Sequence, residues 1–235
     1  MAEIQTFPDA AAWAEACADR LADSLSAALL RDGKAVFAGS GGSTPAPIYA
    51  RLAEAPLDWT KVVVTLIDER YVPESSPESN AALIKRTLLA GPAAAARLLP
   101  LYSPQVTVDR AAALAAHALA AEGGHLDAVL LGMGEDGHIC SMFPESPTLK
   151  TLLSPNLHPT VLGVPTGRDG RGPTLERLSI NLPYLMGAGR VVLALTGAAK
   201  RDVFEREAAG DPNTQPIAAL VANDVPLEVL WTEKA

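Results

Sequence analysis

The stretch KVVVTLID, residues 61–68, is a run of β-branched and apolar residues without polar alternation. Such a run is typical of a strand that is buried on both faces of a parallel sheet. Further apolar runs share this character: AVFAGS (35–40), LDAVLLG (126–132), RLSINL (177–182), RVVLALTG (190–197) and LEVLWT (227–232). Together they predict the strands of a mostly parallel sheet.

Segments with helical periodicity alternate with these strands. Residues 8–31 carry large or apolar side chains at a spacing of four, namely Trp13, Cys17, Leu21, Leu25 and Leu29. This spacing predicts an amphipathic helix that is opened by Pro8 and closed at Gly33. Further helices are predicted at about 45–54, 78–89, 107–122 (with Thr107 as its cap) and 199–209. The alternation predicts a doubly wound α/β fold with helices on both faces of the sheet.

The domain organisation follows from length and composition. A chain of 235 residues with 49% hydrophobic and 20% charged residues fits one globular domain over 1–235. Residues 143–173 are rich in Pro, Gly and Ser, which predicts loops with one short strand near Val161. This leaves room for a small subdomain within 143–175.

Charge and hydropathy exclude several classes of function. The net charge is −8, from 27 acidic and 19 basic residues, and no Lys/Arg run offers a nucleic-acid surface. No apolar run approaches the roughly eighteen residues of a membrane span, and the N-terminus does not resemble a secretory signal. Two cysteines, Cys17 and Cys140, favour reduced thiols over a disulfide scaffold. We expect a cytoplasmic protein that is a monomer or a weak homodimer.

The first candidate binding segment is SGGSTP, residues 40–45, between a predicted strand and a predicted helix. Gly41 and Gly42 let the backbone approach an anion closely, while Ser43 and Thr44 add hydroxyl donors. The chain has no GxxxxGK[ST] motif, so this is not a nucleotide P-loop. An ordinary tight turn would explain the same residues equally well.

The second candidate segment, Asp68-Glu69-Arg70, ends the predicted strand at 61–68. Two acids and a base are unusual for a turn that only reverses the chain. Arg70 is suited to bind a phosphate or a carboxylate in a bidentate manner. A structural ion pair between Asp68 and Arg70 is the alternative interpretation.

The third candidate segment is GMGEDGH, residues 132–138. It matches GxGxxG formally, but no regular helix is predicted after it, and no acid occurs between Glu145 and Asp169. The segment therefore argues against a dinucleotide site. What remains is Asp136 two residues before His138, and a carboxylate beside an imidazole can prepare it as a general base.

The remaining polar residues are less informative. Lys200 begins a predicted helix and is placed either to reach the same crevice or to lie on the helix surface. The other histidines are better explained as structural or solvated residues, and none has the spacing of a metal ligand: His117, His125 and His158. No GxSxG elbow is present, and Cys140 is a less favoured nucleophile. The residues alone predict an enzyme for a small phosphorylated substrate that uses His138 as its base, without a metal or an organic cofactor.

Four segments, in this order, resemble the 6-phosphogluconolactonase family: SGGSTP (40–45), DERYVPESSPESN (68–80), LGMGEDGHICSMFP (131–144) and GAAKRDVF (197–204). The resemblance extends from Val36 to the strand LEVLWT. It implies a Rossmann-like three-layer α/β/α architecture, which the family shares with glucosamine-6-phosphate deaminases.

Two positions separate this chain from the deaminases, which are the first alternative. Deaminases carry a tyrosine where this chain has Arg70, and a glutamate where it has Phe143. Residues 140–142, Cys-Ser-Met, depart from the Ala-Ser-Leu that is typical of lactonases, a change that is conservative in size. A non-catalytic sugar-phosphate sensor is the second alternative, but such a sensor has no need of Asp136 and His138.

The resemblance implies hydrolysis of 6-phospho-D-glucono-1,5-lactone to 6-phospho-D-gluconate, a step of the oxidative pentose phosphate pathway. It implies that His138 activates a water for attack on C1 and that Asp136 orients the imidazole. It also implies a set of substrate- and phosphate-binding residues: Gly41, Gly42, Ser43, Thr44, Asp68, Arg70 and Lys200. Which of Arg168, Arg171 and Arg177 reaches the substrate stays open.

Overall fold

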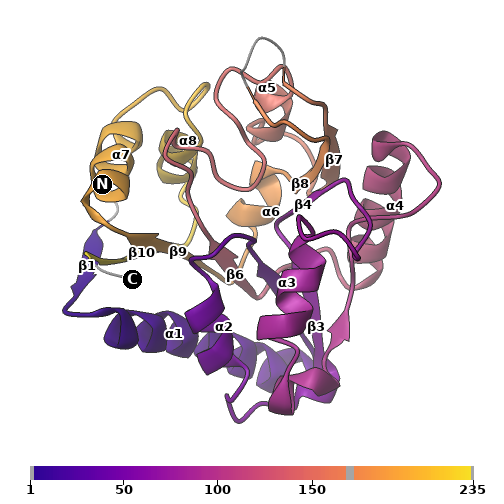
Figure 1. The fold of residues 1–235 in the computed structure, drawn as a ribbon, viewed down its shortest axis with the longest axis vertical. Helices are drawn as coiled ribbons and strands as arrows, with labels where there is room; N and C mark the ends of the chain where they lie inside the picture. Colours follow the sequence, from indigo (N-terminus) through magenta and orange to yellow (C-terminus); the bar gives the residue numbers. More distant parts are fainter. Residues whose placement is uncertain (1–2, 168–171, 234–235) are drawn as a thin grey trace.

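The computed structural model describes residues 3–167 and 172–233. A seven-stranded sheet crosses its centre in the order β1-β10-β9-β6-β2-β3-β5, and every neighbouring pair is parallel (Figure 1). Its strands are β1 (Ile4–Phe7), β2 (Ala35–Gly39), β3 (Val62–Leu66), β5 (Arg97–Leu98), β6 (Ala128–Leu131), β9 (Arg190–Thr196) and β10 (Leu227–Thr232). The predicted mostly parallel sheet is confirmed.

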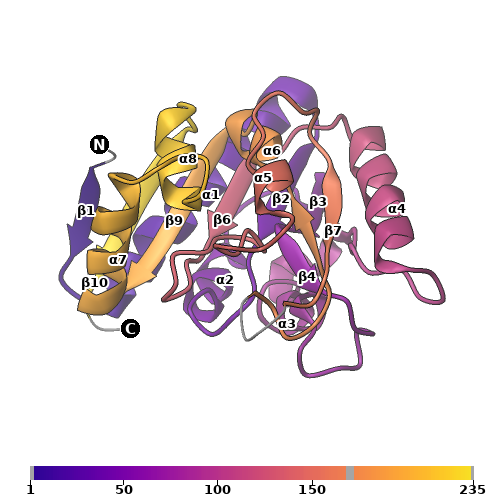
Figure 2. The ribbon, with the colours of Figure 1, turned by 90° about the horizontal axis from the view of Figure 1, so that it is seen from above.

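Helices cover both faces of this sheet. On one face lie α1 (Ala10–Asp32) and α2 (Ala46–Leu52). On the other lie α6 (Leu182–Met186), α7 (Ala198–Ala208) and α8 (Pro216–Ala222), as Figures 1 and 2 show from two directions. The remaining helices are α3 (Asn80–Thr87), α4 (Val108–Ala121), α5 (Leu149–Leu152) and the short 3₁₀ helices at Trp59–Lys61 and Gly91–Ala95. The fold is therefore a three-layer α/β/α sandwich.

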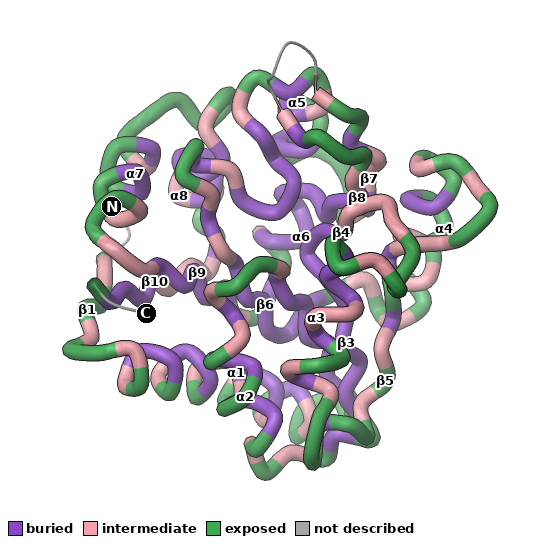
Figure 3. The backbone as a smooth tube through the Cα atoms, viewed as in Figure 1, coloured by how far each residue is buried: buried purple, intermediate pink, exposed green. Residues whose placement is uncertain are grey.

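Helix α1 shows how the sequence produces these elements. Asp9 caps its first turn by accepting a hydrogen bond from the Ala12 amide at 2.8 Å, so the cap is Asp9 and the helix does not open at Pro8. Gly33 ends the helix in the left-handed conformation, with φ = 72°. Trp13 is fully buried and donates from Nε1 to the carbonyl oxygen of Leu230 on β10. The apolar stripe of the helix thus faces the sheet, within the buried layer that Figure 3 colours purple.

A second, smaller sheet lies beside the first. It is antiparallel, in the order β4-β8-β7, and consists of β4 (Asp68–Arg70), β8 (Arg177–Ile180) and β7 (Val161–Val164). Helix α4 packs on β7 and β8. The strand near Val161 is confirmed, whereas the segment 177–182 is a strand only as far as Ile180 and belongs to this second sheet. The division into domains stays a prediction.

The predicted strand at 61–68 is wrong in one respect, because two strands share it. The chain leaves the main sheet at Ile67, whose amide donates to Gly39 on β2 and whose carbonyl oxygen accepts from Ile180 on β8, both at 3.0 Å. Asp68 therefore begins a strand of the second sheet. Since both sheets bury this segment, its hydropathy does not reveal where it changes sheet.

The sequence analysis missed β1, β5, α5, α6 and α8, all of which have seven residues or fewer. A segment of seven residues or fewer is too short to show a clear hydrophobic periodicity. Its secondary structure can therefore be inferred only from the residues that flank it. Among residues 3–167 and 172–233, no helix combines the length and the apolar composition that a membrane span requires.

Candidate active site

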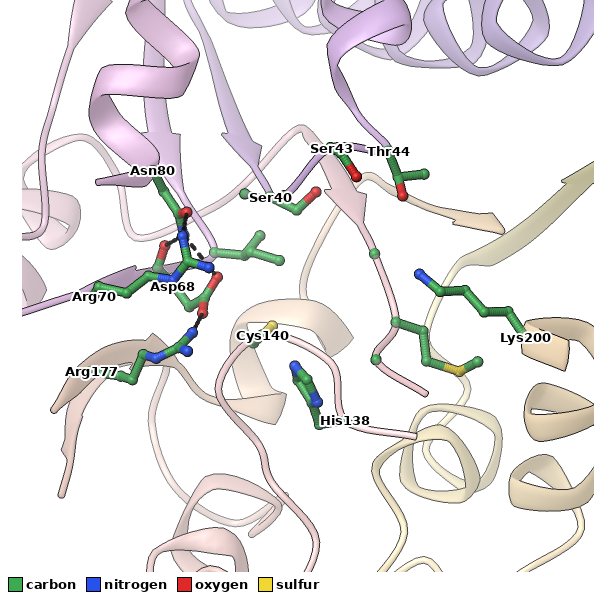
Figure 4. A pocket seen from close by; sticks show the side chains of 16 residues that line it. Ser40, Ser43, Thr44, Asp68, Arg70, Asn80, His138, Cys140, Arg177 and Lys200 are labelled. Carbon is green, nitrogen blue, oxygen red and sulfur yellow. Dashed lines mark hydrogen bonds and ion pairs between the residues drawn. The ribbon is translucent and has the colours of Figure 1, made fainter. Parts of the chain in front are cut away.

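A pocket of about 230 Å³ lies beyond the carboxyl ends of β2, β3, β6 and β9. In open parallel sheets this is the position where ligands bind. Most of the predicted site residues line it: Gly41, Gly42, Ser43, Thr44, Asp68, Arg70, His138 and Lys200. Figure 4 shows the side chains of Ser43, Thr44, Asp68, Arg70, His138 and Lys200 around one hollow, together with Asn80 and Arg177, which the sequence analysis did not place in the site. Asp136 does not line the pocket itself but contacts His138, which does.

The loop that carries His138 is shaped by its glycines. The Gly134 amide donates to the His138 carbonyl oxygen at 2.9 Å, and Gly137 turns the chain with φ = 83°. A Cβ at Gly134 would lie 2.3 Å from Nδ1 of His138, so a larger residue there would displace the imidazole. The middle glycine of the GxGxxG pattern, Gly134, thus allows close packing against the histidine.

Asp136 and His138 form a hydrogen-bonded pair. Nδ1 of the imidazole lies 2.5 Å from Oδ1 of Asp136, which also accepts from the His138 amide at 3.3 Å. Burial alone would raise the pKa of the Asp136 carboxyl, but the hydrogen bond and the charge of His138 outweigh it and lower that pKa below its usual value. A carboxylate that accepts from Nδ1–H leaves the lone pair on Nε2. His138 is therefore set up to accept a proton at Nε2.

One side of the pocket is a set of four side chains, Asp68, Arg70, Asn80 and Arg177, which we call the arginine wall. Nη1 of Arg70 donates to Oδ1 of Asn80 at 2.7 Å and to the Glu78 carbonyl oxygen at 2.9 Å. Asn80 in turn donates from Nδ2 to the carbonyl oxygen of Asp68 at 2.9 Å. Nη1 of Arg177 lies 3.5 Å from Oδ2 of Asp68. The alternative interpretation, a structural ion pair between Asp68 and Arg70, is wrong, because Asp68 forms its ion pair with Arg177.

The neighbouring Glu69 faces away from the pocket and anchors this wall. Its fully buried carboxylate accepts hydrogen bonds at 2.8 Å from the amides of Arg70, Asn80 and Ala81, at the start of α3. Burial raises the pKa of Glu69, although these hydrogen bonds lower it in part. Of the two acidic residues in the segment 68–70, Asp68 therefore lines the pocket and Glu69 is buried inside the fold.

The two guanidinium groups of the arginine wall keep unused donors. Nε of Arg70 and Nε of Arg177 are buried and have no hydrogen-bond partner among the described residues. Burial lowers the pKa of Arg177; the charge of Arg70 lowers it further, while Asp68 raises it. Arg177 answers the open question about the arginines in part, since it lines the pocket. Arg168 and Arg171 lie outside the described residues.

The opposite side of the pocket is formed by Ser43, Thr44 and Lys200, which we call the lysine wall (Figure 4). Ser43 is exposed and Thr44 half-buried, in the turn where Gly42 has φ = 90°. Lys200 comes from the first turn of α7, is half-buried, and makes no hydrogen bond or ion pair within the part of the chain that the structure describes. Its ammonium points into the hollow.

The two walls meet at Gly41. A Cβ at this position would lie 1.9 Å from Oδ1 of Asn80, so only glycine lets the turn pass the arginine wall. Arg70 and Lys200 lie on opposite sides of the hollow, so the structure separates two cations that the sequence analysis placed in one set of substrate- and phosphate-binding residues.

Cys140 lines the pocket but is not suited to nucleophilic attack. Its side chain is buried, and its backbone is left-handed with φ = 51°. Burial raises the pKa of the thiol well above its usual value, and the charge of Asp68 raises it further. The thiolate that nucleophilic attack requires is therefore disfavoured. No group of three or more His, Cys, Asp or Glu side chains in residues 3–167 and 172–233 is arranged to hold a metal ion.

Comparison with known proteins shows to which family the chain belongs. The family model of glucosamine-6-phosphate isomerases/6-phosphogluconolactonase matches residues 8–231. A 6-phosphogluconolactonase of Mesorhizobium japonicum is 42% identical over 96% of this chain and 93% of its own length. The crystal structure of a 6-phosphogluconolactonase from Shewanella baltica matches with a TM-score of 0.89 and 29% identity, covering 99% of this chain and 98% of that one.

A monomeric glucosamine-6-phosphate deaminase shares the fold, with a TM-score of 0.75 at 16% identity, covering 98% of this chain and 97% of that one. Both branches that the sequence resembles therefore have the architecture described above, and the family match covers residues 8–231, from the residues just before α1 into β10. The chain belongs to the glucosamine-6-phosphate isomerase/6-phosphogluconolactonase family.

Proposed function

We propose that this protein hydrolyses 6-phospho-D-glucono-1,5-lactone to 6-phospho-D-gluconate, with His138 as the base that activates water. The observation that carries the proposal is the placement of the Asp136–His138 pair at a pocket with cations on two sides, Arg70 and Arg177 on one and Lys200 on the other. In a protein with a net charge of −8, this pocket concentrates the positive charge that an anionic sugar requires. The names of the relatives support the same substrate.

The proposed reaction needs one base and no covalent intermediate. Nε2 of His138 accepts a proton from a water molecule while the water oxygen bonds to C1 of the lactone. The carbonyl oxygen takes up negative charge in the tetrahedral intermediate. When the bond from C1 to the ring oxygen breaks, the ring oxygen takes the proton back from Nε2 and leaves as a hydroxyl. Asp136 holds Nδ1–H throughout and stabilises the imidazolium.

The substrate carries negative charge at two places, its phosphate and the developing oxyanion at C1, and the pocket has two cationic walls. We place the phosphate at the lysine wall, where Lys200 has no other partner and the glycine turn offers backbone amides and hydroxyls. The lactone end then meets the arginine wall, whose guanidinium groups are held in fixed positions by Asn80 and Asp68. Arg70 is thereby proposed to bind the reacting end of the substrate.

The test is a coupled assay in which the lactone is generated in situ and release of the acid is followed. His138→Ala should lower turnover by about 10²–10⁴-fold, the usual contribution of a positioned base. The matched control is His125→Ala, because His125 lies away from the pocket, with Nε2 3.3 Å from Asp127. Turnover by His138→Ala that equals that of the control would remove His138 from the mechanism.

A further inference from the structure

Phe143 lies against the imidazole of His138. The centroids of the two rings are 4.2 Å apart and their planes differ by 31°. Phe143 is 7% exposed, so its ring has a defined place in the fold. Asp136 at the edge of the imidazole and Phe143 at its face are the side-chain contacts that position this base.

The face contact supplies a constraint that the hydrogen bond lacks. The imidazole can swivel about its Cβ–Cγ bond, and the hydrogen bond at Nδ1 opposes this swivel only as firmly as the carboxylate itself is held. The side chain of Asp136 is itself 53% exposed, which makes it a soft anchor. A flat ring packed against the imidazole opposes the swivel and keeps Nε2 directed at the hollow.

Phe143 is in turn held from two directions. A tight turn at Ile139–Met142, in which the Met142 amide donates to the Ile139 carbonyl oxygen at 2.9 Å, brings Phe143 back over the histidine. In addition, Cζ of Arg177 lies 5.4 Å from the centroid of the Phe143 ring, within the range of a cation–π contact. The same aromatic ring therefore contacts the base and a guanidinium of the arginine wall.

We propose that Phe143 is a positioning residue: its ring fixes the plane of the His138 imidazole and ties it to Arg177. This role rests on the proposed function, in which Nε2 of His138 accepts the proton of water. A flat side chain is what position 143 requires, and its apolar volume alone is not sufficient.

The experiment compares Phe143→Leu, which keeps an apolar side chain but removes the flat face, with Phe143→Tyr, which keeps the face. Phe143→Leu should lower kcat about 10- to 100-fold with little change in KM, because a misdirected base costs turnover and leaves binding intact. Phe143→Tyr should retain most of the kcat. The control is Phe7→Leu, the same substitution on the edge strand β1, and thermal unfolding of each variant separates loss of fold from loss of rate.

A double substitution tests whether Phe143 acts through the base. In a His138→Ala background, Phe143→Leu should cause no further loss of the residual activity, since residues that act as a unit are not additive. A full further loss in that background would overturn the positioning role. Equal kcat values for Phe143→Leu and Phe143→Tyr would overturn it as well.

A measurement without substrate separates this proposal from the proposed function. The imidazole protons of His138, assigned as the signals lost in His138→Ala, should show a ring-current shift in NMR spectra that Phe143→Leu removes and Phe143→Tyr keeps. A shift that is unchanged in Phe143→Leu overturns the ring contact, whatever the activity. If the unsubstituted protein shows this shift but does not hydrolyse the lactone, the proposed function fails instead, and with it the catalytic purpose of the contact.

Discussion

The two walls of the pocket carry the same sign of charge but are built in opposite ways. In the arginine wall, Asp68 and Asn80 are 5% and 2% exposed, and each guanidinium is tied to a side chain that is itself held. In the lysine wall, Ser43 is exposed and the ammonium of Lys200 has no partner among the described residues. One wall is held together by contacts between its own side chains, and the other has no such contacts among the described residues.

This difference matches the two tasks of the proposed reaction. Donors that face a developing charge are most effective when they need no reorganisation during the reaction. A group that only captures a phosphate can remain mobile and solvated until it binds. The two walls have the same formal charge, so we assign their functions from how firmly each cation is held.

The largest effect is expected from replacing Asp68, the carboxylate that pairs with Arg177 in the arginine wall. Asp68→Ala should lower the free energy of unfolding by about 3 kcal/mol, because it leaves the guanidinium of Arg177 buried without its carboxylate. Denaturant unfolding measures the change. Ser43→Ala on the lysine wall is the control and should change stability by less than about 0.5 kcal/mol. Similar losses of unfolding free energy in the two variants would mean that the side chains of the two walls are held equally firmly.

The next effect concerns catalysis at the arginine wall. Arg70→Ala should lower kcat/KM about 10- to 150-fold, equivalent to the roughly 1.5–3 kcal/mol of a hydrogen bond to a charged group. If Arg70 binds the reacting end, the loss should be similar for the phosphorylated lactone and for the unphosphorylated one, after correction for spontaneous hydrolysis. A loss confined to the phosphorylated lactone would place the phosphate at the arginine wall and reverse our assignment.

A smaller effect is expected at the lysine wall. Lys200→Met keeps the length of the side chain and removes its charge, which should lower kcat/KM about 2- to 5-fold, or roughly 0.5–1 kcal/mol, because solvent weakens a half-exposed ion pair. The loss should appear mainly in KM, only with the phosphorylated lactone, and should diminish at high salt because a half-exposed charge is screened. An unchanged KM across salt concentrations would exclude Lys200 from phosphate capture.

The smallest effect is expected at Cys140, which lies in the pocket but belongs to neither wall. Because burial and the charge of Asp68 raise the pKa of its thiol, iodoacetamide should not modify Cys140 in the folded protein at pH 8. Mass spectrometry of the native and the unfolded protein measures the difference. Cys140→Ala should retain the activity of the unsubstituted protein, and a large loss of turnover would reopen its role as a nucleophile.

The sequence was sufficient for the features that depend on local pattern. The buried strands of the main sheet, the long helix with Gly33 at its end, and the pairing of Asp136 with His138 were all readable, because each depends on residues close together in the chain. The motifs also met at one pocket, since the carboxyl ends of parallel strands share one edge of the sheet.

The features that depend on distant pairing were not readable. Arg177 reaches the pocket only because β8 pairs with β4, a contact between segments that are far apart in the chain. Asn80 was given no role of its own by the sequence analysis, and its contact with Arg70 follows from the hydrogen bonds of Glu69 to α3. Phe143 was noted only as a difference from deaminases, because no sequence pattern shows that a ring folds back over a histidine five positions earlier.

The change of sheet at Ile67 also has a consequence for synthesis on the ribosome. The chain emerges from its N-terminus, so Asp68 and Arg70 leave the exit tunnel long before Arg177, which pairs with Arg70 across β4 and β8. Strand β1 stays without its pairing strand still longer, because its neighbour β10 ends at Thr232. Contacts between distant segments form slowly, and unpaired strand edges are exposed until they do. The pocket is thus among the last parts of the nascent protein to be completed. A chain released after residue 138 but before residue 177 contains His138 but lacks Arg177 and Lys200.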